Sequence, residues 1–269
     1  MELSPPRGKG DGTVFDRAAS SYGRVGPDFF SVLGALLVEH ATVLAGSRLI
    51  DIAAGTGAVS LAAFDQLGPT GSVLAVDLAP EMLTHLRQRL DGKLPTSLVT
   101  AVMDAECLSL RGGSFDVALS GIALQSMLHP QSAALEMCRV LRSGGAFGIS
   151  ISKGWWWEED PRWNWHATLL DGLGVVLEGA PPSSGEHFID QLLFDMPLSG
   201  IERSREVLEF EFEDADVFWK WCWSHGWRGV IERLTAEQRD GYRKGIFESI
   251  GDGPMPGQLV ANLATAARK

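Results

Sequence analysis

A glycine-rich turn and two aspartates are the residues of this chain best suited to bind a small polar ligand. Asp51 ends a short apolar segment and precedes a turn that contains Gly55 and Gly57. Glycines let a ligand approach the backbone closely, and a carboxylate can accept hydrogen bonds from a cationic or hydroxyl-bearing group. Asp77 ends the next apolar segment, "SVLAVD", where it can accept from both hydroxyls of a ribose. The pair therefore predicts a cofactor that contains a nucleoside, without deciding which one.

A third carboxylate narrows the choice of cofactor. Asp104 follows the apolar segment "SLVTAVM" and precedes Ala105. The Asp104 carboxylate can accept from an adenine amino group while the adjacent backbone amide meets a ring nitrogen. Aspartate is common in turns, so this position is informative only because it follows Asp51 and Asp77 in order.

The elements that must position these residues alternate between strands and helices. Short apolar segments separated by amphipathic helices predict parallel strands covered on both faces. We expect strands at 48–53, 72–78, 97–103, 115–120, 146–152, 205–214 and 258–269. The predicted fold is α/β: a doubly wound, mostly parallel, seven-stranded Rossmann-like sheet with an N-terminal helical lid and a late, Trp-rich helical cap.

The chain divides into three predicted parts. Residues 1–12 are expected to form a disordered tail, because they are rich in Gly and Pro and lack an apolar core. Residues 13–152 are expected to hold the lid helices and the cofactor-binding core, and 153–269 the substrate cap with the last strands, packed as one unit. His40 falls on the apolar stripe of a predicted helix and is expected to be a buried structural histidine.

The cap supplies the candidate substrate residues. All nine tryptophans lie between Trp155 and Trp227, which predicts large apolar walls for an aromatic or polyketide-like acceptor. We expect Trp155 and Trp157 to contact the substrate and the others mostly to fill the core of the cap. His225 is the candidate general base and His166 a weaker candidate for substrate contact, although both can equally be buried structural histidines.

Residues 47–152 resemble class I S-adenosylmethionine-dependent methyltransferases, most closely the ubiquinone/menaquinone-biosynthesis type. The blocks "LIDIAAGTG", "VLAVDLAPEML", "MDAECLSLRGGSFDVALS" and "EMCRVLRSGGAFGIS" carry the resemblance. It implies S-adenosylmethionine as the cofactor. The resemblance places the glycine-rich turn with Asp51 along the methionine part, Asp77 on the ribose, and Asp104 with Ala105 on the adenine.

The same resemblance implies further contacts. Leu78 and Met82 would flank the adenine, Gly121 would line the pocket near the sulfonium, and Tyr22 would touch the cofactor from the lid. Ala53 stands where the family turn commonly has its first glycine, and Ser143 where a proline commonly precedes a glycine pair. Neither departure removes a carboxylate.

The predicted reaction is methyl transfer by in-line displacement to O, N or C of a hydrophobic small molecule. Such a transfer depends mainly on alignment of the reacting atoms and needs no metal. Three alternatives stay open: a non-methylating enzyme, such as a cyclase, that only binds the cofactor; a binding protein without activity; and an NAD(P)-dependent oxidoreductase. The last would place Ser60 at the third glycine position of the dinucleotide turn, where close packing favours Gly or Ala.

Composition limits the partners. The net charge of −11 disfavours nucleic acid, and no apolar run approaches the roughly 20 residues needed to span a bilayer. Three widely spaced cysteines, Cys107, Cys138 and Cys222, predict buried thiols in a cytoplasmic protein and no disulfide framework. An apolar face on residues 28–45 would allow a homodimer, but the face can equally pack on the chain's own sheet.

Overall fold

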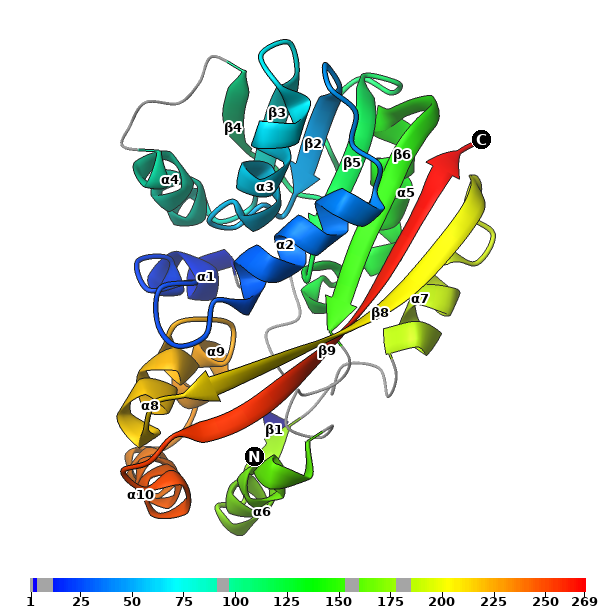
Figure 1. Ribbon diagram of the computed structural model, residues 1–269. Coiled ribbons are helices and arrows are strands. Elements are labelled where there is room, and N and C mark those ends of the chain that lie inside the picture. The colour runs from blue at the N-terminus through cyan, green and yellow to red at the C-terminus, as the bar shows by residue number, and fades with distance from the viewer. Residues whose placement is uncertain (1, 4–11, 91–96, 153–159, 178–184) are drawn as a thin grey trace.

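The structure is a computed structural model and describes residues 2–3, 12–90, 97–152, 160–177 and 185–269. Its centre is a seven-stranded sheet of order β4-β3-β2-β5-β6-β9-β8 (Figure 1). The strands are β2 (Arg48–Ile52), β3 (Ser72–Asp77), β4 (Leu98–Val102), β5 (Phe115–Gly121), β6 (Leu141–Ser152), β8 (Leu198–Phe212) and β9 (Met255–Arg268). Neighbours from β4 through β6 pair in parallel, whereas β9 is antiparallel to both β6 and β8. The predicted mostly parallel, seven-stranded Rossmann-like sheet is therefore confirmed.

Helices cover both faces of this sheet. On one face, α2 (Phe29–His40), α3 (Ala58–Leu67) and α4 (Pro80–Arg89) bury apolar residues against β2, β3 and β5. On the other face, α5 (Pro130–Val140) and α7 (Gly185–Leu193) pack against Ile149 and Ile151 of β6. Strands buried on both sides explain why the sequence reads as short apolar runs without alternation.

The last two strands are longer than the sheet and continue beyond it. Residues 261–267 of β9 pair with β6, whereas the rest of β9, back to Met255, pairs with β8 alone. This two-stranded ribbon projects past the sheet towards α8 and α10 (Figure 1). The helical elements of this C-terminal region are η3 (Pro161–Trp163), α6 (Asn164–Gly172), α8 (Ala215–Trp223), α9 (Arg228–Ile231) and α10 (Ala236–Ile250). The ribbon thereby joins the predicted cap to the sheet.

The N-terminal segment differs in part from the expected tail. Glu2 and Leu3 form β1, which pairs in parallel with β7 (Val176–Leu177), so these two residues belong to a small two-stranded sheet. Residues 1 and 4–11 lie outside the described residues. The helix α1 (Gly12–Ala18) follows and lies beside α4 and α9.

Helix α2 packs its apolar face against the chain's own sheet. Phe29, Leu33 and Leu37 are buried in the core, where α2 contacts β5 and β6. The expectation for His40 was wrong. It is the last residue of the helix, its side chain is 39% exposed, and its Nε2 lies 3.3 Å from Oε1 of Glu206 on β8. A helix that ends at this position turns its final side chain towards the edge strand instead of the core.

Candidate functional site

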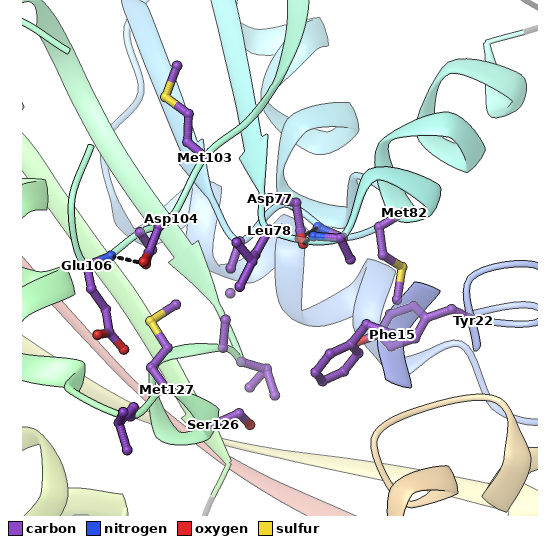
Figure 2. Close-up of a pocket in the computed structure, with 18 residues that line it drawn as sticks. Phe15, Tyr22, Asp77, Leu78, Met82, Met103, Asp104, Glu106, Ser126 and Met127 are labelled. Carbon is purple, nitrogen blue, oxygen red and sulfur yellow. Dashed lines mark hydrogen bonds between the residues drawn. The ribbon is translucent and has the colours of Figure 1, made fainter. Parts of the chain in front are cut away.

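The main pocket discussed for the described chain lies beyond the carboxyl ends of β2, β3, β4 and β5, with Phe15 of α1 in its wall (Figure 2). Ligands bind at this edge of open parallel sheets because the connecting loops diverge there. The pocket is lined by Phe15, Tyr22, Ala53, Gly55, Asp77, Leu78, Ala79, Met82, Met103, Asp104, Ala105, Glu106, Gly121, Ile122, Ala123, Ser126, Met127 and Leu128. Most of the residues that the sequence proposed for cofactor binding therefore meet at one cavity.

A second, adjoining pocket shares part of this lining. Tyr22, Gly55 and Ile122 border both cavities, and Asp51 borders only the adjoining one. The two cavities thus meet at the glycine-rich turn. An elongated ligand could place one end in each and its middle at the shared residues.

The turn between β2 and α3 has an unusual backbone. Ala53, Gly55 and Gly57 all have positive φ angles, of 56°, 54° and 90°. Gly55 donates its amide to Asp77 Oδ2 at 2.7 Å, and a Cβ at this position would meet only the Tyr22 ring, at 4.0 Å. Gly57 lines neither pocket; a Cβ there would lie 2.2 Å from the Leu86 side chain. Gly57 therefore serves the packing of the turn against α4.

Asp51 is held in place on one side only. Its carboxylate is 1% exposed, and Oδ2 accepts hydrogen bonds from the amide and the hydroxyl of Ser60 at 2.9 and 2.6 Å. Within the described residues, Oδ1 is buried without a hydrogen-bond partner. Burial, and secondarily the charge of Asp77, raise the pKa of Asp51 to about 7. A buried carboxylate with one unpartnered oxygen beside a cavity is suited to a cationic or donor group of a ligand.

Asp77 ends β3 and is oriented by the backbone around it. Its Oδ1 accepts from the Ala79 amide at 2.8 Å, while Oδ2 accepts from Gly55. Burial raises the pKa of Asp77, against the opposing effect of these amides. Each carboxylate oxygen can accept more than one hydrogen bond, so Asp77 retains capacity for ligand hydroxyls.

The wall opposite the lid comes from the loop after β4. Asp104 Oδ1 accepts from the Glu106 amide at 2.9 Å, and Glu106 Oε1 accepts from the His129 amide at 2.9 Å. These bonds tie the loop at Asp104 to the start of α5. Leu78, 45% exposed, and Met82 of α4 line the same cavity and give it an apolar surface beside Asp77.

Aromatic residues close the pocket on the α1 side. Tyr22 stacks on Phe30 with ring centroids 4.8 Å apart, and Phe15 meets Tyr22 edge-on at 6.5 Å. Burial, with the nearby charge of Asp77, raises the pKa of Tyr22, so its hydroxyl keeps its proton at neutral pH. Figure 2 shows Phe15 and Tyr22 on the same side of the cavity as Met82. The pocket wall includes Tyr22, as proposed from the sequence, and also Phe15.

Sequence reasoning missed Ile122 and Met127 as well as Phe15. Ile122 follows Gly121 and has a φ of 49°, which is rare for a β-branched residue. Its amide donates to the backbone oxygen of Ser150 at 3.0 Å and to the hydroxyl oxygen at 3.1 Å, and both bonds hold this conformation. The only signal in the sequence was the position of Ile122 directly after a predicted pocket residue.

The candidate histidines lie outside both pockets. His225 donates from Nδ1 to the Trp221 oxygen at 2.8 Å, and burial lowers its pKa to about 4. Its neighbour Gly226 faces Phe15, because a Cβ there would lie 3.6 Å from that ring. His166 is fully buried and its Nε2 bonds the Tyr242 hydroxyl at 2.6 Å. The structure thus brings neither histidine to the described pockets, and Trp155 and Trp157 lie outside the described residues.

The remaining expectations concern cysteines, metals and membranes. All three cysteines are free; Cys138 and Cys222 are buried as predicted, whereas Cys107 is exposed, contrary to the expectation. In the part of the chain that the structure describes, no cluster of His, Cys, Asp and Glu side chains could hold a metal ion. None of the described helices is long and apolar enough to cross a membrane.

Known proteins resemble this chain in its α/β core. A methyltransferase-domain family matches residues 50–149. Aklanonic acid methyltransferase DauC of Streptomyces sp. strain C5 is 30% identical over 137 residues, which are 51% of this chain and 62% of DauC. The ubiquinone/menaquinone biosynthesis C-methyltransferase UbiE of Chromobacterium violaceum is 40% identical over 117 residues, which are 42% of this chain and 46% of UbiE. The chain thus spans about half to three fifths of the length of these relatives.

The fold is also found among solved structures. The YcgJ protein of Bacillus subtilis superposes with a TM-score of 0.60 at 20% identity, covering 88% of this chain and 98% of YcgJ. At this identity the likeness concerns the fold alone. It extends past the matched family segment into the C-terminal region.

Proposed function

We propose that the protein is a class I S-adenosylmethionine-dependent methyltransferase that methylates a hydrophobic small molecule, because residues 50–149 match a methyltransferase-domain family and the chain is similar to UbiE and DauC. The main support is the meeting of three carboxylates at one edge of the sheet. Asp51, Asp77 and Asp104 stand at the ends of successive strands, each beside a cavity. Each carboxylate matches one polar part of the cofactor: the ammonium, the ribose and the adenine.

The residues present fit this cofactor. The buried, unpartnered Oδ1 of Asp51 lies where a ligand ammonium would complete its hydrogen bonding. Asp77 can accept from the ribose hydroxyls, and Asp104 with the Ala105 amide can meet the adenine edge. When bound, S-adenosylmethionine supplies a methyl group already activated by a positively charged sulfur. The acidic lining, Asp77, Asp104 and Glu106, favours such a cation.

The acceptor is proposed to be neutral and largely apolar. Phe15, Ile122, Met127 and Leu128 give the described cavity an apolar surface near Gly121. Within the described lining of both pockets no Lys, Arg or His is present, so an anionic acceptor would meet carboxylates without a compensating cation. The printed names of the similar proteins DauC and UbiE, an aklanonic acid methyltransferase and a ubiquinone/menaquinone biosynthesis C-methyltransferase, support a small-molecule acceptor.

The protein's own contribution to the reaction is alignment. In-line displacement needs the acceptor atom, the methyl carbon and the sulfur in one line, and an effective site excludes water around them. Tyr22 and Ile122 line both cavities where they meet, and Phe15 lies beside Tyr22 in one of them. Rigid hydrogen bonds to Asp51 and Asp77 fix the cofactor side of that line.

The general base predicted from the sequence, His225, lines neither of the two described pockets. A His225 pKa of about 4 leaves its ring neutral at pH 7, but makes it a weak base. His225 as catalytic base, and His166, Trp155 and Trp157 as substrate residues, stay predictions. Replacement of His225 by Ala tests the first: turnover falls while cofactor affinity is retained if the imidazole takes a proton.

Binding and product formation test the function in two steps. Calorimetric titration with S-adenosylmethionine, S-adenosylhomocysteine and NADH is expected to give micromolar affinity for the first two and none for NADH. Mass spectrometry of an acceptor screen is then expected to detect a methylated product together with S-adenosylhomocysteine. Acceptor conversion without S-adenosylhomocysteine would instead support a non-methylating reaction, such as a cyclisation. Binding of NADH alone would overturn the assignment.

A further inference from the structure

Helix α1 touches three parts of the molecule through three consecutive residues. Phe15 lines the main pocket, Asp16 contacts α4, and Arg17 contacts Glu232 at the end of α9. Figure 1 shows α1 between α4 and α9, at the junction of the sheet domain and the C-terminal region. The position of α1 therefore depends on both regions at once.

The contact with α4 lies on the cofactor side. The Glu81 amide, in the first turn of α4, donates to Asp16 Oδ1 at 2.9 Å. Below the same helix end, Met82 packs with Phe15, Tyr22 and Ala19 in one small apolar cluster. This contact fixes one side of α1 to an element that borders the pocket.

The contact with α9 is a network of charged groups. The Arg17 guanidinium makes two hydrogen bonds to the Glu232 carboxylate, the one from Nε at 3.0 Å. Arg228 Nε also donates to Glu232 Oε1 at 2.7 Å, and Arg228 Nη1 donates to the Arg17 backbone oxygen at 2.8 Å. Glu232 thus joins two arginines, and its side chain is only 26% exposed. Charge-assisted, bidentate geometry makes such a network stronger than an ordinary surface ion pair.

Phe15 connects this network to the pocket. Its ring faces Gly226, two residues before Arg228, and it meets the ring of Tyr22, which borders both cavities. Any loosening of α1 from α9 would therefore displace this aromatic wall of the pocket.

We propose that Glu232 is a positioning residue: by holding Arg17, it keeps α1 over the cofactor pocket, so that the C-terminal region sets how fast the cofactor leaves. The proposal rests on the proposed function, because it takes S-adenosylmethionine and S-adenosylhomocysteine as the ligands. It assigns Glu232 no contact with either ligand. The C-terminal region thereby acts on cofactor exchange as well as on the acceptor.

The test compares Glu232→Gln with the wild-type protein. The measurements are the S-adenosylhomocysteine dissociation rate by stopped-flow displacement and, without ligand, the hydrogen exchange of residues 13–27 by mass spectrometry. Removing the charge is expected to raise the dissociation rate about three- to tenfold and to speed exchange in this segment. Glu248→Gln is the matched control, because Glu248 pairs with Lys244 on α10 without reaching α1. This control is expected to change neither quantity.

Two further variants separate positioning from general destabilisation. Arg17→Met is expected to change the dissociation rate and the hydrogen exchange as much as Glu232→Gln does. The double variant should change them little further, because both substitutions remove the same contact. Glu232→Asp is expected to restore part of the slow dissociation. A lowered melting temperature with unchanged dissociation and exchange would overturn the proposal. If wild-type protein fails to bind S-adenosylhomocysteine, the proposed function fails, while the exchange measurement still tests the hold of Glu232 on α1.

Discussion

Two groups of buried ionisable side chains have strongly shifted pKa values, and they lie in different regions. At the sheet edge, burial raises the pKa of Asp51 to about 7 and also raises that of Asp77. In the C-terminal region, burial lowers the pKa of His166 to about 3 and raises that of Tyr242. Asp77 and Asp51 border the two described pockets, and Oδ1 of Asp51 is buried there without a hydrogen-bond partner among the described residues. A shifted pKa therefore marks a candidate site when a cavity adjoins it, and a core when other side chains saturate it.

The aromatic core of the C-terminal region surrounds His166 and Tyr242 with other rings. It consists of Trp163, Trp165, His166, Phe212, Phe218, Trp221, Trp227 and Tyr242. The Tyr242 hydroxyl accepts from Trp227 Nε1 at 3.0 Å and shares a hydrogen bond with His166 Nε2. These bonds satisfy polar atoms that would otherwise be costly to bury. Trp163, Trp165, Trp221 and Trp227 thus fill the core of the cap, as expected for most of the tryptophans, whereas the proposed substrate residues Trp155 and Trp157 lie outside the described residues.

The largest expected effect is on the stability of that core. Trp163 is fully buried, packs on Trp165 and Phe218, and donates from Nε1 to the Pro256 oxygen at 2.9 Å. Trp163→Ala is expected to lower the free energy of unfolding by about 3–5 kcal/mol, measured by urea denaturation. Folded protein should still bind S-adenosylhomocysteine at the sheet edge. A loss of affinity in the folded fraction would contradict the division between core and site.

The next effect is on cofactor affinity. Asp77→Ala removes the carboxylate that is expected to hold the ribose, and should weaken S-adenosylhomocysteine binding by about 1–3 kcal/mol in calorimetry. The substitution should cost the protein less stability than Trp163→Ala, because Asp77 lies at a pocket wall. An unchanged dissociation constant would remove Asp77 from the site.

The raised pKa of Asp51 predicts a pH dependence of binding. In the ligand-free protein, a pKa of about 7 means that Asp51 takes up a proton as the pH falls below 7, and that its ionisation weakens folding as the pH rises from about 4 to 7. A ligand ammonium favours the ionised form, so binding must release that proton. Affinity for S-adenosylhomocysteine should rise up to about tenfold per pH unit towards pH 7 and then level off.

Calorimetry in two buffers of different ionisation enthalpy measures the released proton directly. Asp51→Asn should bind more weakly and lose this pH dependence. Proton release that persists in Asp51→Asn would assign the titration to another group, for which Asp77 is the nearest candidate.

A smaller effect is expected from the hydroxyl at the centre of the aromatic core. Tyr242→Phe leaves Trp227 Nε1 and His166 Nε2 without this partner, and should lower the free energy of unfolding by about 1–2 kcal/mol. Cofactor affinity should not change. Loss of turnover at full stability and full affinity would instead point to a catalytic role for the His166–Tyr242 pair.

The same contrast explains what the sequence could predict. Asp51, Asp77 and Asp104 were recognisable because each stands at or near the carboxyl end of its own strand, and parallel strands bring these ends to one edge. Phe15 was not, because its place in the pocket depends on contacts with α4 and α9, which are distant in the sequence. Gly57 was assigned to the ligand, whereas its position is set by the Leu86 side chain across the turn.

In the C-terminal region, the sequence predicted the last two strands but not the contacts that their residues and the histidines make. The alternation in 205–214 and the apolar stretch 258–269 correctly predicted β8 and β9. Nothing local could show that these strands continue past the sheet, because that extension depends on packing against η3 and α8. The partners of His166 and His225 likewise come from segments that only the tertiary fold brings together.

The smallest effect concerns the backbone of the glycine-rich turn. Ala53 has a φ of 56°, a conformation that costs an L-residue about 1–2 kcal/mol and glycine almost nothing. The greater freedom of glycine in the unfolded chain offsets about 0.5–1 kcal/mol, so Ala53→Gly should stabilise the protein by less than about 1 kcal/mol. Thr42→Gly is the matched control, because Thr42 has a φ of 52° and lies outside both pockets. Both variants are expected to stabilise the protein equally. If only Ala53→Gly also alters cofactor affinity, the ligand contacts the Ala53 methyl group, and the effect on affinity does not come from relief of backbone strain.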